Sequence, residues 1–190
     1  MERAVVFAGF GGQGLLFAGQ VLARAAIRDG LEAFWIPSYG PEMRGGTASC
    51  TVIVGDAEIG SPIVDRYDAA VVMNPPSLAK FEPRIADGGL LVVNTSLVDA
   101  AAVPARAGVE VVQLPCTELA AAAGDDKLVS VVALGALVER LGLVGAPAIR
   151  DTIRDVVGAK RPDIVEADIG AFEAGRSAVA GAAVAGAAVA

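Results

Sequence analysis

The chain has 190 residues, of which 54% are hydrophobic and 19% charged, and it contains no histidine. Its 15 Lys and Arg residues against 22 Asp and Glu give a net charge of −7, which argues against a nucleic-acid partner, because neutralising phosphates requires clustered basic side chains. Without histidine the chain lacks the usual general base at neutral pH and the commonest metal ligand, so Ser-His-Asp and Cys-His hydrolases and most zinc enzymes are excluded.

A chain of this length is expected to form one domain, and its first elements alternate between strand and helix. Residues 3–8 are a short apolar run typical of a buried strand. After a glycine-rich stretch, apolar residues at helical spacing predict a helix over Leu15–Arg28, with Gly30 as its C-terminal stop. A second strand is predicted over residues 33–36, and the glycine and proline content of residues 38–47 indicates a loop.

The rest of the chain continues this alternation and then becomes helical. Strand-like runs follow at residues 48–54, 69–73, 90–93 and 109–114, and residues 76–85 predict a short helix with proline in its first turn. From Thr117 onwards we predict helices over residues 127–141, 146–157 and 162–174. Strands alternating with helices, followed by helices, indicate an α/β domain with a mostly parallel sheet covered on both faces.

The last residues, 176–190, are rich in Ala, Val and Gly and contain a five-residue repeat, 178–182 followed by 183–187. We expect this tail to extend the last helix or to be disordered. It is shorter than the roughly 20 apolar residues that span a bilayer. The N-terminus leads directly into a strand-like run, without a signal peptide. We therefore expect a protein that has no membrane segment and is cytoplasmic.

The sharpest local feature is the pattern strand, Gly9-x-Gly11-x-x-Gly14, helix. Glycines allow a tight turn and a close approach to a ligand, and the amides and dipole at a helix start attract anions. The pattern has the form of a dinucleotide-binding fingerprint and predicts a Rossmann-like first βα unit. That fingerprint also requires an acid at the end of the second strand, where this chain has Ile36-Pro37-Ser38, so an adenosine-ribose site is disfavoured. The alternative is that the glycines only permit a tight turn and close packing.

A second motif is the decapeptide at residues 38–47, which combines glycines with one tyrosine, one acid and one base. Arg44 could bind a phosphate or carboxylate through two hydrogen bonds. The alternative is a Glu42–Arg44 charge pair that merely orders a connection. Composition does not separate the two interpretations.

Two smaller features have mainly structural interpretations. Asn74-Pro75-Pro76 follows a strand at a place where a parallel sheet would face a ligand, but the sequence favours a strand end and helix start. Cys50 and Cys116 form no metal-binding pattern and are more typical of buried packing residues than of nucleophiles.

Taken in order, several motifs resemble the gamma subunit of 2-oxoacid:ferredoxin oxidoreductases over residues 3–175. They are Gly9–Gly14, residues 38–46, Thr47-Ala48-Ser49-Cys50, Ile59-Gly60-Ser61-Pro62, Asn74-Pro75-Pro76-Ser77-Leu78, Ala133-Leu134-Gly135-Ala136 and Ala171-Phe172-Glu173-Ala174-Gly175. Two of these forms, Gly45-Gly46-Thr47-Ala48-x-Cys50 and Ile59-Gly60-Ser61-Pro62, are most like the 2-oxoglutarate-type (2-oxoglutarate synthase) branch. Before Ala133, where relatives often have an asparagine, this chain has Ser130-Val131-Val132, so an amide-specific role is not carried over, and a hydroxyl could substitute for the amide.

The resemblance implies a three-layer α/β/α domain over residues 1–175, with 176–190 outside it. It also implies a multi-subunit enzyme that decarboxylates a 2-oxoacid on thiamine diphosphate with magnesium, passes electrons through iron–sulfur clusters to ferredoxin, and releases an acyl-coenzyme A. The partners would be alpha and beta subunits, with or without a ferredoxin-like delta subunit. This chain would have no catalytic residue, metal site or stably bound cofactor of its own, and its domain would close over the active site and assist coenzyme A.

From the motifs and the resemblance together, we expect two adjoining segments to form the site. Gly9, Gly11, Gly12, Gln13 and Gly14 would form an anion-receptive turn, and a neighbouring loop would contact partner subunits or coenzyme A phosphates through Tyr39, Glu42, Arg44, Gly45 and Gly46. Two alternatives remain, a stand-alone nucleotide-binding oxidoreductase and a purely structural interaction subunit. Because the interfaces between obligate subunits are as apolar as a protein core, the apolar excess also predicts that the isolated chain, without its partner subunits, either forms a homodimer or aggregates.

Overall fold

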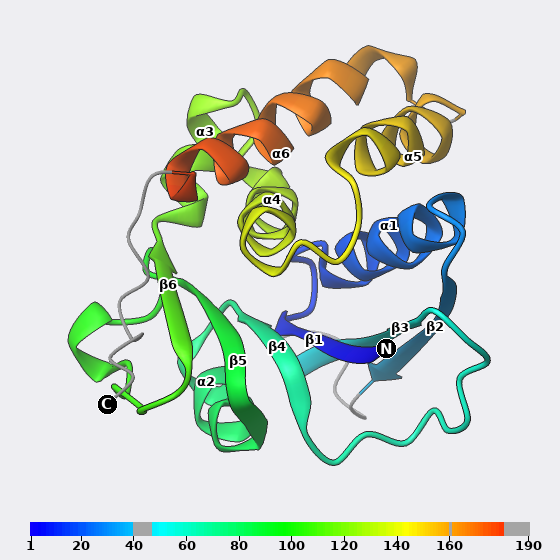
Figure 1. Ribbon diagram of the computed structural model, residues 1–190. Helices are drawn as coiled ribbons and strands as arrows, with labels where there is room; N and C mark the ends of the chain where they lie inside the picture. The colour runs from blue at the N-terminus through cyan, green and yellow to red at the C-terminus, as the bar shows by residue number, and fades with distance from the viewer. Residues whose placement is uncertain (40–46, 160, 181–190) are drawn as a thin grey trace.

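The computed structural model describes residues 1–39, 47–159 and 161–180, which form a single sheet with helices on both faces (Figure 1). The strands are β1 (Glu2–Phe10), β2 (Glu32–Tyr39), β3 (Thr47–Gly55), β4 (Tyr67–Val72), β5 (Ile85–Asn94) and β6 (Glu110–Leu114). The helices are α1 (Leu15–Arg28), α2 (Pro75–Phe81), α3 (Cys116–Ala122), α4 (Val129–Leu141), α5 (Ala146–Gly158) and α6 (Val165–Val179). Four short 3₁₀ turns complete the described elements: η1 (Glu82–Arg84), η2 (Ala100–Ala102), η3 (Asp126–Leu128) and η4 (Pro162–Ile164).

Helix α1 has the bounds that the sequence predicts, and the residues that define its apolar stripe are all buried. Helix α2 is shorter than predicted. It ends at Phe81, and Glu82–Arg84 forms a 3₁₀ turn. Pro83 lies in this turn and has no amide to donate, so the α-helical ladder stops there and the chain enters β5 at Ile85.

The strand order is β2-β3-β1-β4-β5-β6. Strand β1 is parallel to β4, β4 to β5, and β5 to β6, whereas β3 is antiparallel to both β1 and β2. All strands except β3 therefore run in one direction, which confirms the mostly parallel sheet. The Rossmann-like unit forms as β1 and α1, but β3 occupies the position beside β1 where a dinucleotide-binding fold has its second strand.

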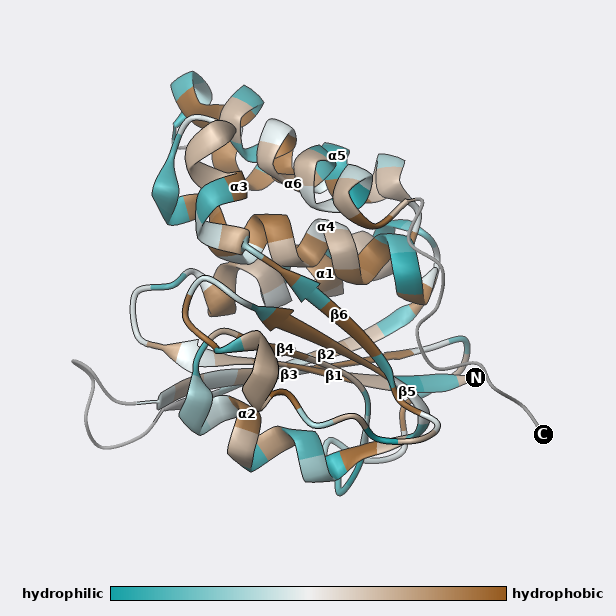
Figure 2. Ribbon diagram, turned by 90° about the vertical axis from the view of Figure 1, so that its left-hand side faces the viewer, coloured by the Kyte–Doolittle hydropathy of each residue, from teal (hydrophilic) through white to brown (hydrophobic). Residues whose placement is uncertain are grey.

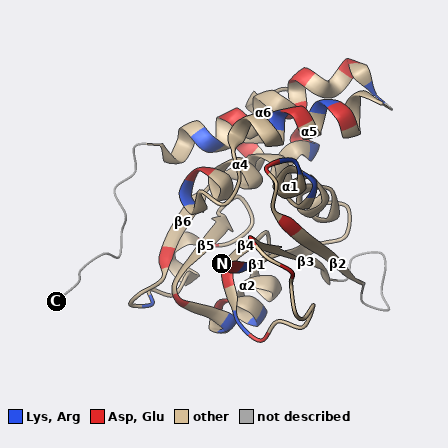
Figure 3. Cartoon of the chain, turned by 45° about the vertical axis from the view of Figure 1, so that its right-hand side comes forward, with Lys and Arg blue, Asp and Glu red and all other residues tan. Residues whose placement is uncertain are grey.

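The two faces of the sheet are covered unequally. Helices α1 and α4 lie against one face, with α3, α5 and α6 outside them, whereas α2 lies on the other face (Figures 1 and 2). Each face contributes its own apolar cluster, because successive residues along a strand point to opposite sides. Charged residues of both signs lie along the outer helices α5 and α6, where Arg150 contacts Glu173 at 2.8 Å (Figure 3).

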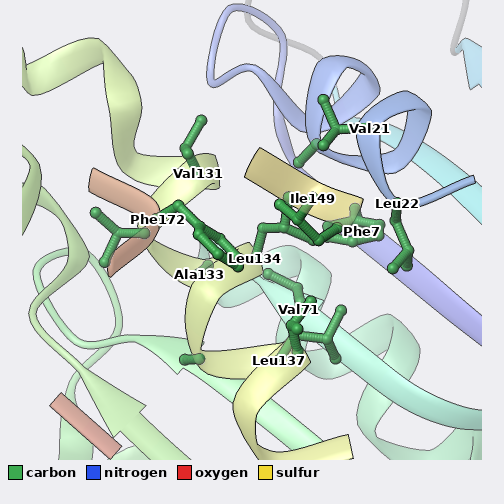
Figure 4. Packing of buried hydrophobic residues seen from close by; sticks show 14 of the residues in the cluster. Phe7, Val21, Leu22, Val71, Val131, Ala133, Leu134, Leu137, Ile149 and Phe172 are labelled. Atoms are coloured by element: carbon green, nitrogen blue, oxygen red, sulfur yellow. The ribbon is translucent and has the colours of Figure 1, made fainter. Parts of the chain in front are cut away.

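Helices α4 and α6 cross at very short range through two glycines. A Cβ on Gly135 would stand 2.0 Å from the carbonyl oxygen of Phe172, and one on Gly175 would stand 1.8 Å from the carbonyl oxygen of Val132. This close approach lets the Phe172 ring pack beside Leu134 in the core (Figure 4). The two late motifs of the sequence, at residues 133–136 and 171–175, are therefore the contact surfaces of two helices.

No helix in the described ranges is long and apolar enough to cross a membrane. Helix α6 continues beyond Gly175 to Val179, and residues 181–190 lie outside the described ranges. The domain boundary at residue 175 therefore stays a prediction.

Candidate functional site

The glycine-rich segment forms the turn between β1 and α1. Gly9 still belongs to β1, and the amide of Phe10 donates a 2.7 Å hydrogen bond to Oε1 of Gln13, which closes the turn. Gly12 and Gly14 both have left-handed backbones, with φ of 95° and 76°. Gly14 is the N-cap of α1, and its carbonyl oxygen accepts from the amide of Ala18 at 3.0 Å. The turn therefore presents the start of a helix at the carboxyl end of β1.

The beginning of α1 is fixed from two sides. The thiol of Cys50 on β3 donates to the carbonyl oxygen of Leu15 over 3.3 Å. On the other side, a Cβ placed on Gly14 would stand 2.5 Å from Oγ of Ser130, in the first turn of α4. No side chain caps α1, and its first turn contains no acid. The first amides of α1 therefore have no side-chain cap, and no acid in the first turn offsets the positive end of its dipole, as anion binding would require.

The second predicted segment reaches the same edge of the sheet. Tyr39 pairs with Ala48, Ala48 pairs with Gly9, and Thr47 pairs with Phe10. Thr47 and Ala48, which follow residues 40–46, therefore lie beside the glycine turn, whereas Tyr39, which precedes that segment, lies one strand further away. The predicted site residues Glu42, Arg44, Gly45 and Gly46, and the side chain of Tyr39, lie outside the residues that the structure describes.

Two asparagines organise the carboxyl ends of the neighbouring strands. Asn74 follows β4 and caps α2, with its Oδ1 accepting from the amide of Ser77 at 2.8 Å, so the interpretation of Asn74-Pro75-Pro76 as a helix start is confirmed. Asn94 ends β5, and its Oδ1 accepts from the amides of Ser96 and Cys116, each at 3.1 Å. The sequence interpretation missed Asn94, although an asparagine directly after a buried apolar run is a recognisable signal.

Buried polar atoms without a hydrogen-bond partner are concentrated at the carboxyl ends of the strands and the helix starts beside them. Of the seven such side-chain atoms in the described part of the chain, four belong to residues at the strand ends or helix starts just described: Asn74 Nδ2, Ser77 Oγ, Asn94 Nδ2 and Ser130 Oγ. A buried polar group without a partner costs roughly 1–3 kcal/mol. Such groups are rare in folded proteins and point to a water or ligand that completes them.

Neither cysteine thiol is suited to act as a nucleophile. Burial raises the pKa of both Cys50 and Cys116 to about 12, so neither forms a thiolate at neutral pH. The two lie on separate elements, β3 and the start of α3. Among the described residues, no group of three or more Cys, Asp and Glu side chains could hold a metal ion.

The topology disfavours an adenosine-ribose site. The second strand in sequence, β2, is separated from β1 by β3, so its end lies two strand spacings, roughly 10 Å, from the glycine turn. Its last residues are Pro37-Ser38-Tyr39, without an acid to hold a ribose hydroxyl. The glycine turn therefore has the backbone form of the phosphate-binding turn of a dinucleotide site but lacks the acid that would bind a ribose.

Comparison with known proteins places the chain among oxidoreductase subunits. The sequence profile of the pyruvate ferredoxin/flavodoxin oxidoreductase family matches residues 4–178. The chain is 36% identical over 185 residues to 2-oxoglutarate synthase subunit KorC of Methanothermobacter thermautotrophicus, covering 94% of this chain and 96% of that protein. It is 37% identical over 176 residues to ketoisovalerate oxidoreductase subunit VorA of the same organism, covering 92% of this chain but only 36% of that protein.

The fold has a close counterpart among solved structures. The gamma subunit of a keto/oxoacid ferredoxin oxidoreductase from Geobacter sulfurreducens superposes with a TM-score of 0.80 at 30% identity, covering 93% of this chain and 95% of that one. The resemblance drawn from the ordered motifs and the expected α/β fold are thereby confirmed.

Proposed function

The chain belongs to the pyruvate ferredoxin/flavodoxin oxidoreductase family, and on that premise we propose that it serves as the gamma subunit of a 2-oxoglutarate:ferredoxin oxidoreductase. The complex would oxidatively decarboxylate its 2-oxoacid, reduce ferredoxin and release an acyl-coenzyme A. Thiamine diphosphate, magnesium and the iron–sulfur clusters would be held by the alpha and beta subunits, with or without a delta subunit. The cysteines of this chain, buried and with raised pKa values, are consistent with that division.

One observation carries the choice of 2-oxoglutarate. This chain and the 2-oxoglutarate synthase subunit KorC match from end to end, with 94% and 96% of their lengths aligned. The VorA relative, in contrast, is much longer, and this chain spans only 36% of it. Alignment over nearly the whole of a 2-oxoglutarate synthase subunit supports a matching place in a complex.

Sequence identity supports a second substrate to a similar degree. Identity to the ketoisovalerate subunit VorA, at 37%, equals that to KorC within one percentage point. A branched-chain 2-oxoacid is therefore the alternative substrate. The two acids differ in chemistry, since 2-oxoglutarate has a second carboxylate and ketoisovalerate has a branched apolar group.

Within the complex, we assign the glycine turn an anion-binding role. Gly9, Gly11, Gly12, Gln13 and Gly14 would bring the uncapped start of α1 to a phosphate of coenzyme A. The loop with Tyr39, Glu42, Arg44, Gly45 and Gly46 would contact the same phosphates or a partner subunit. Because β3 begins beside the turn and β2 ends one strand further out, the segment between them would act on the same group as the turn.

The substrate assignment is tested on the assembled enzyme. The chain is purified anaerobically from its native source, the accompanying subunits are identified, and viologen reduction is measured with 2-oxoglutarate, ketoisovalerate and pyruvate in the presence of coenzyme A. We expect the highest kcat/KM with 2-oxoglutarate. Preference for ketoisovalerate would establish the alternative substrate, and the absence of both partner subunits and 2-oxoacid-dependent reduction would refute the proposed function.

A variant separates phosphate binding from a purely structural role. Arg44→Ala is expected to raise the KM for coenzyme A about tenfold in an intact complex, because it removes a charge-assisted hydrogen bond. Arg154→Ala, at an exposed pair with Asp151 on α5, is the control and should leave that KM unchanged. Loss of assembly instead of a change in KM would favour the interaction subunit. An unchanged KM together with intact assembly would remove Arg44 from the site.

A further inference from the structure

The first turn of α4 contacts the first turn of α1. Ser130 is the second residue of α4, and its Oγ lies 2.5 Å from the place a Cβ on Gly14 would occupy, while its own Cβ lies 3.6 Å from that place. Its hydroxyl, rather than its methylene, is therefore the group nearest to the N-cap of α1.

The Ser130 hydroxyl is buried and makes no hydrogen bond within the described part of the packed chain. Ser130 is 1% exposed, and in the described structure its Oγ has no hydrogen-bond partner. It is the only polar side chain among the buried residues of α4, which are otherwise Val, Ala, Leu and Gly. An alanine would pack there without the cost of an unpaired hydroxyl, so packing gives no reason for a serine.

The electrostatics of this contact favour an anion. Helix α1 has no side-chain cap and no acid in its first turn, so its positive end is uncompensated by its own side chains, whereas the η3 turn that leads directly into α4 contains Asp126 and is capped by Asp125. Asn94 ends β5, two strands from β1, and pairs with Leu114, which belongs to the apolar cluster on the α4 side of the sheet. Its Nδ2 is a second buried donor without a partner.

We propose that Ser130 is a further binding residue of this site, donating its hydroxyl hydrogen to an oxygen of a phosphate group whose other oxygens are held by the first amides of α1. The proposal rests on the proposed function of the glycine turn and adds a second helix to it. Donors from α1 and α4 approach from different elements. A tetrahedral phosphate, with oxygens in several directions, therefore suits them better than a planar carboxylate.

The experiment uses the full chain and compares two buried hydroxyls. Ser130→Ala removes the hydroxyl beside Gly14. Thr152→Val removes another buried, unpartnered hydroxyl, which lies on α5 near Arg24 and Arg28 at the far end of α1. Binding of pyrophosphate and of coenzyme A is followed by the amide NMR shifts of Gly14 and Leu15. Unfolding in urea is measured for each variant.

We expect Ser130→Ala to weaken pyrophosphate binding about tenfold, as for loss of one hydrogen bond to a charged group, and Thr152→Val to leave it unchanged. Neither variant should lower stability, since each removes an unpaired buried hydroxyl. Ser130→Cys, nearly isosteric but a weak donor, should weaken binding in the same way and serves as the test if the alanine variant does not fold.

The outcomes distinguish this proposal from the one on which it rests. If pyrophosphate shifts the amides of Gly14 and Leu15 and binds wild type and both Ser130 variants equally, the turn binds anions and the role of Ser130 is refuted. If neither pyrophosphate nor coenzyme A shifts those amides in the wild-type chain, the anion-binding role of the turn fails, and the role of Ser130 fails with it.

Discussion

Gly14 is constrained in two independent ways, by its backbone angle and by its neighbour. Its φ of 76° lies in the left-handed region, and a Cβ there would also meet Ser130 Oγ at 2.5 Å. We expect Gly14→Ala to lower the free energy of unfolding by about 2 kcal/mol or more, of which 1–2 kcal/mol is roughly the backbone cost. Urea denaturation measures the loss.

The part of this loss of stability that comes from the contact with Ser130 can be measured separately. In a Ser130→Ala background the 2.5 Å contact disappears, so Gly14→Ala should cost less there than in the wild-type chain. Gly12→Ala is the control, because Gly12 has φ of 95° and no atom within 4 Å of an added Cβ. Its cost should be the same in both backgrounds. Equal costs for Gly14→Ala in the two backgrounds would contradict the contact.

Asp168 on α6 makes stability depend on pH. It is 2% exposed, and burial, together with the charge of Asp125, raises its pKa from 3.8 to about 6. A carboxyl whose pKa is raised by folding binds more protons in the folded state, so its contribution to stability falls as pH rises from about 4 to about 6. Asp168→Asn removes this titration. It should stabilise the chain at pH 7 by on the order of 2 kcal/mol.

Urea unfolding of wild type and Asp168→Asn at several pH values tests this. The difference in stability between the two proteins should be smallest near pH 4 and should grow until about pH 6, while other carboxyls cancel in the comparison. A difference that does not change over this range would show that the carboxyl does not titrate as stated.

At the scale of elements, the α4–α6 crossing depends on its glycines. Gly175→Ala places a Cβ 1.8 Å from the Val132 carbonyl oxygen, so the helices must separate and uncover the core around Phe172. We expect a loss of about 2–3 kcal/mol or failure to fold. Gly170→Ala, in the same helix with nothing within 4 Å, should instead stabilise by roughly 0.5–1 kcal/mol. Similar effects of the two variants on the urea midpoint would contradict the close crossing.

Elements with a strong local signal could be predicted from the sequence. Helix α1 has a glycine turn before it and one continuous apolar stripe, and its bounds are as predicted. The position of β3 could not be predicted, because strand order depends on long-range pairing rather than on local pattern. The segment predicted as a loop at residues 38–47 begins in β2 and ends in β3 for the same reason.

For the whole molecule, exposed apolar side chains support the prediction that the isolated chain self-associates. Phe34 and Leu97 are 46% and 49% exposed, and Ile63 is 81% exposed. Because surfaces that join obligate subunits are apolar, we expect a dimer or larger species by light scattering, which disappears when the chain is co-expressed with its partner subunits. A monomer at high concentration would contradict this prediction.

The sequence by itself determined the α/β class, most elements, the glycine turn and, through ordered motifs, the family. These depend on local periodicity, turn chemistry and motif order, which are all properties of the linear sequence. Only the tertiary structure decided that β3 separates β1 from β2, that Asn94 ties β5 to α3, and that Ser130 meets Gly14. Gly14 and Ser130 are distant in sequence, and their contact arises because α1 and α4 pack side by side on one face of the sheet.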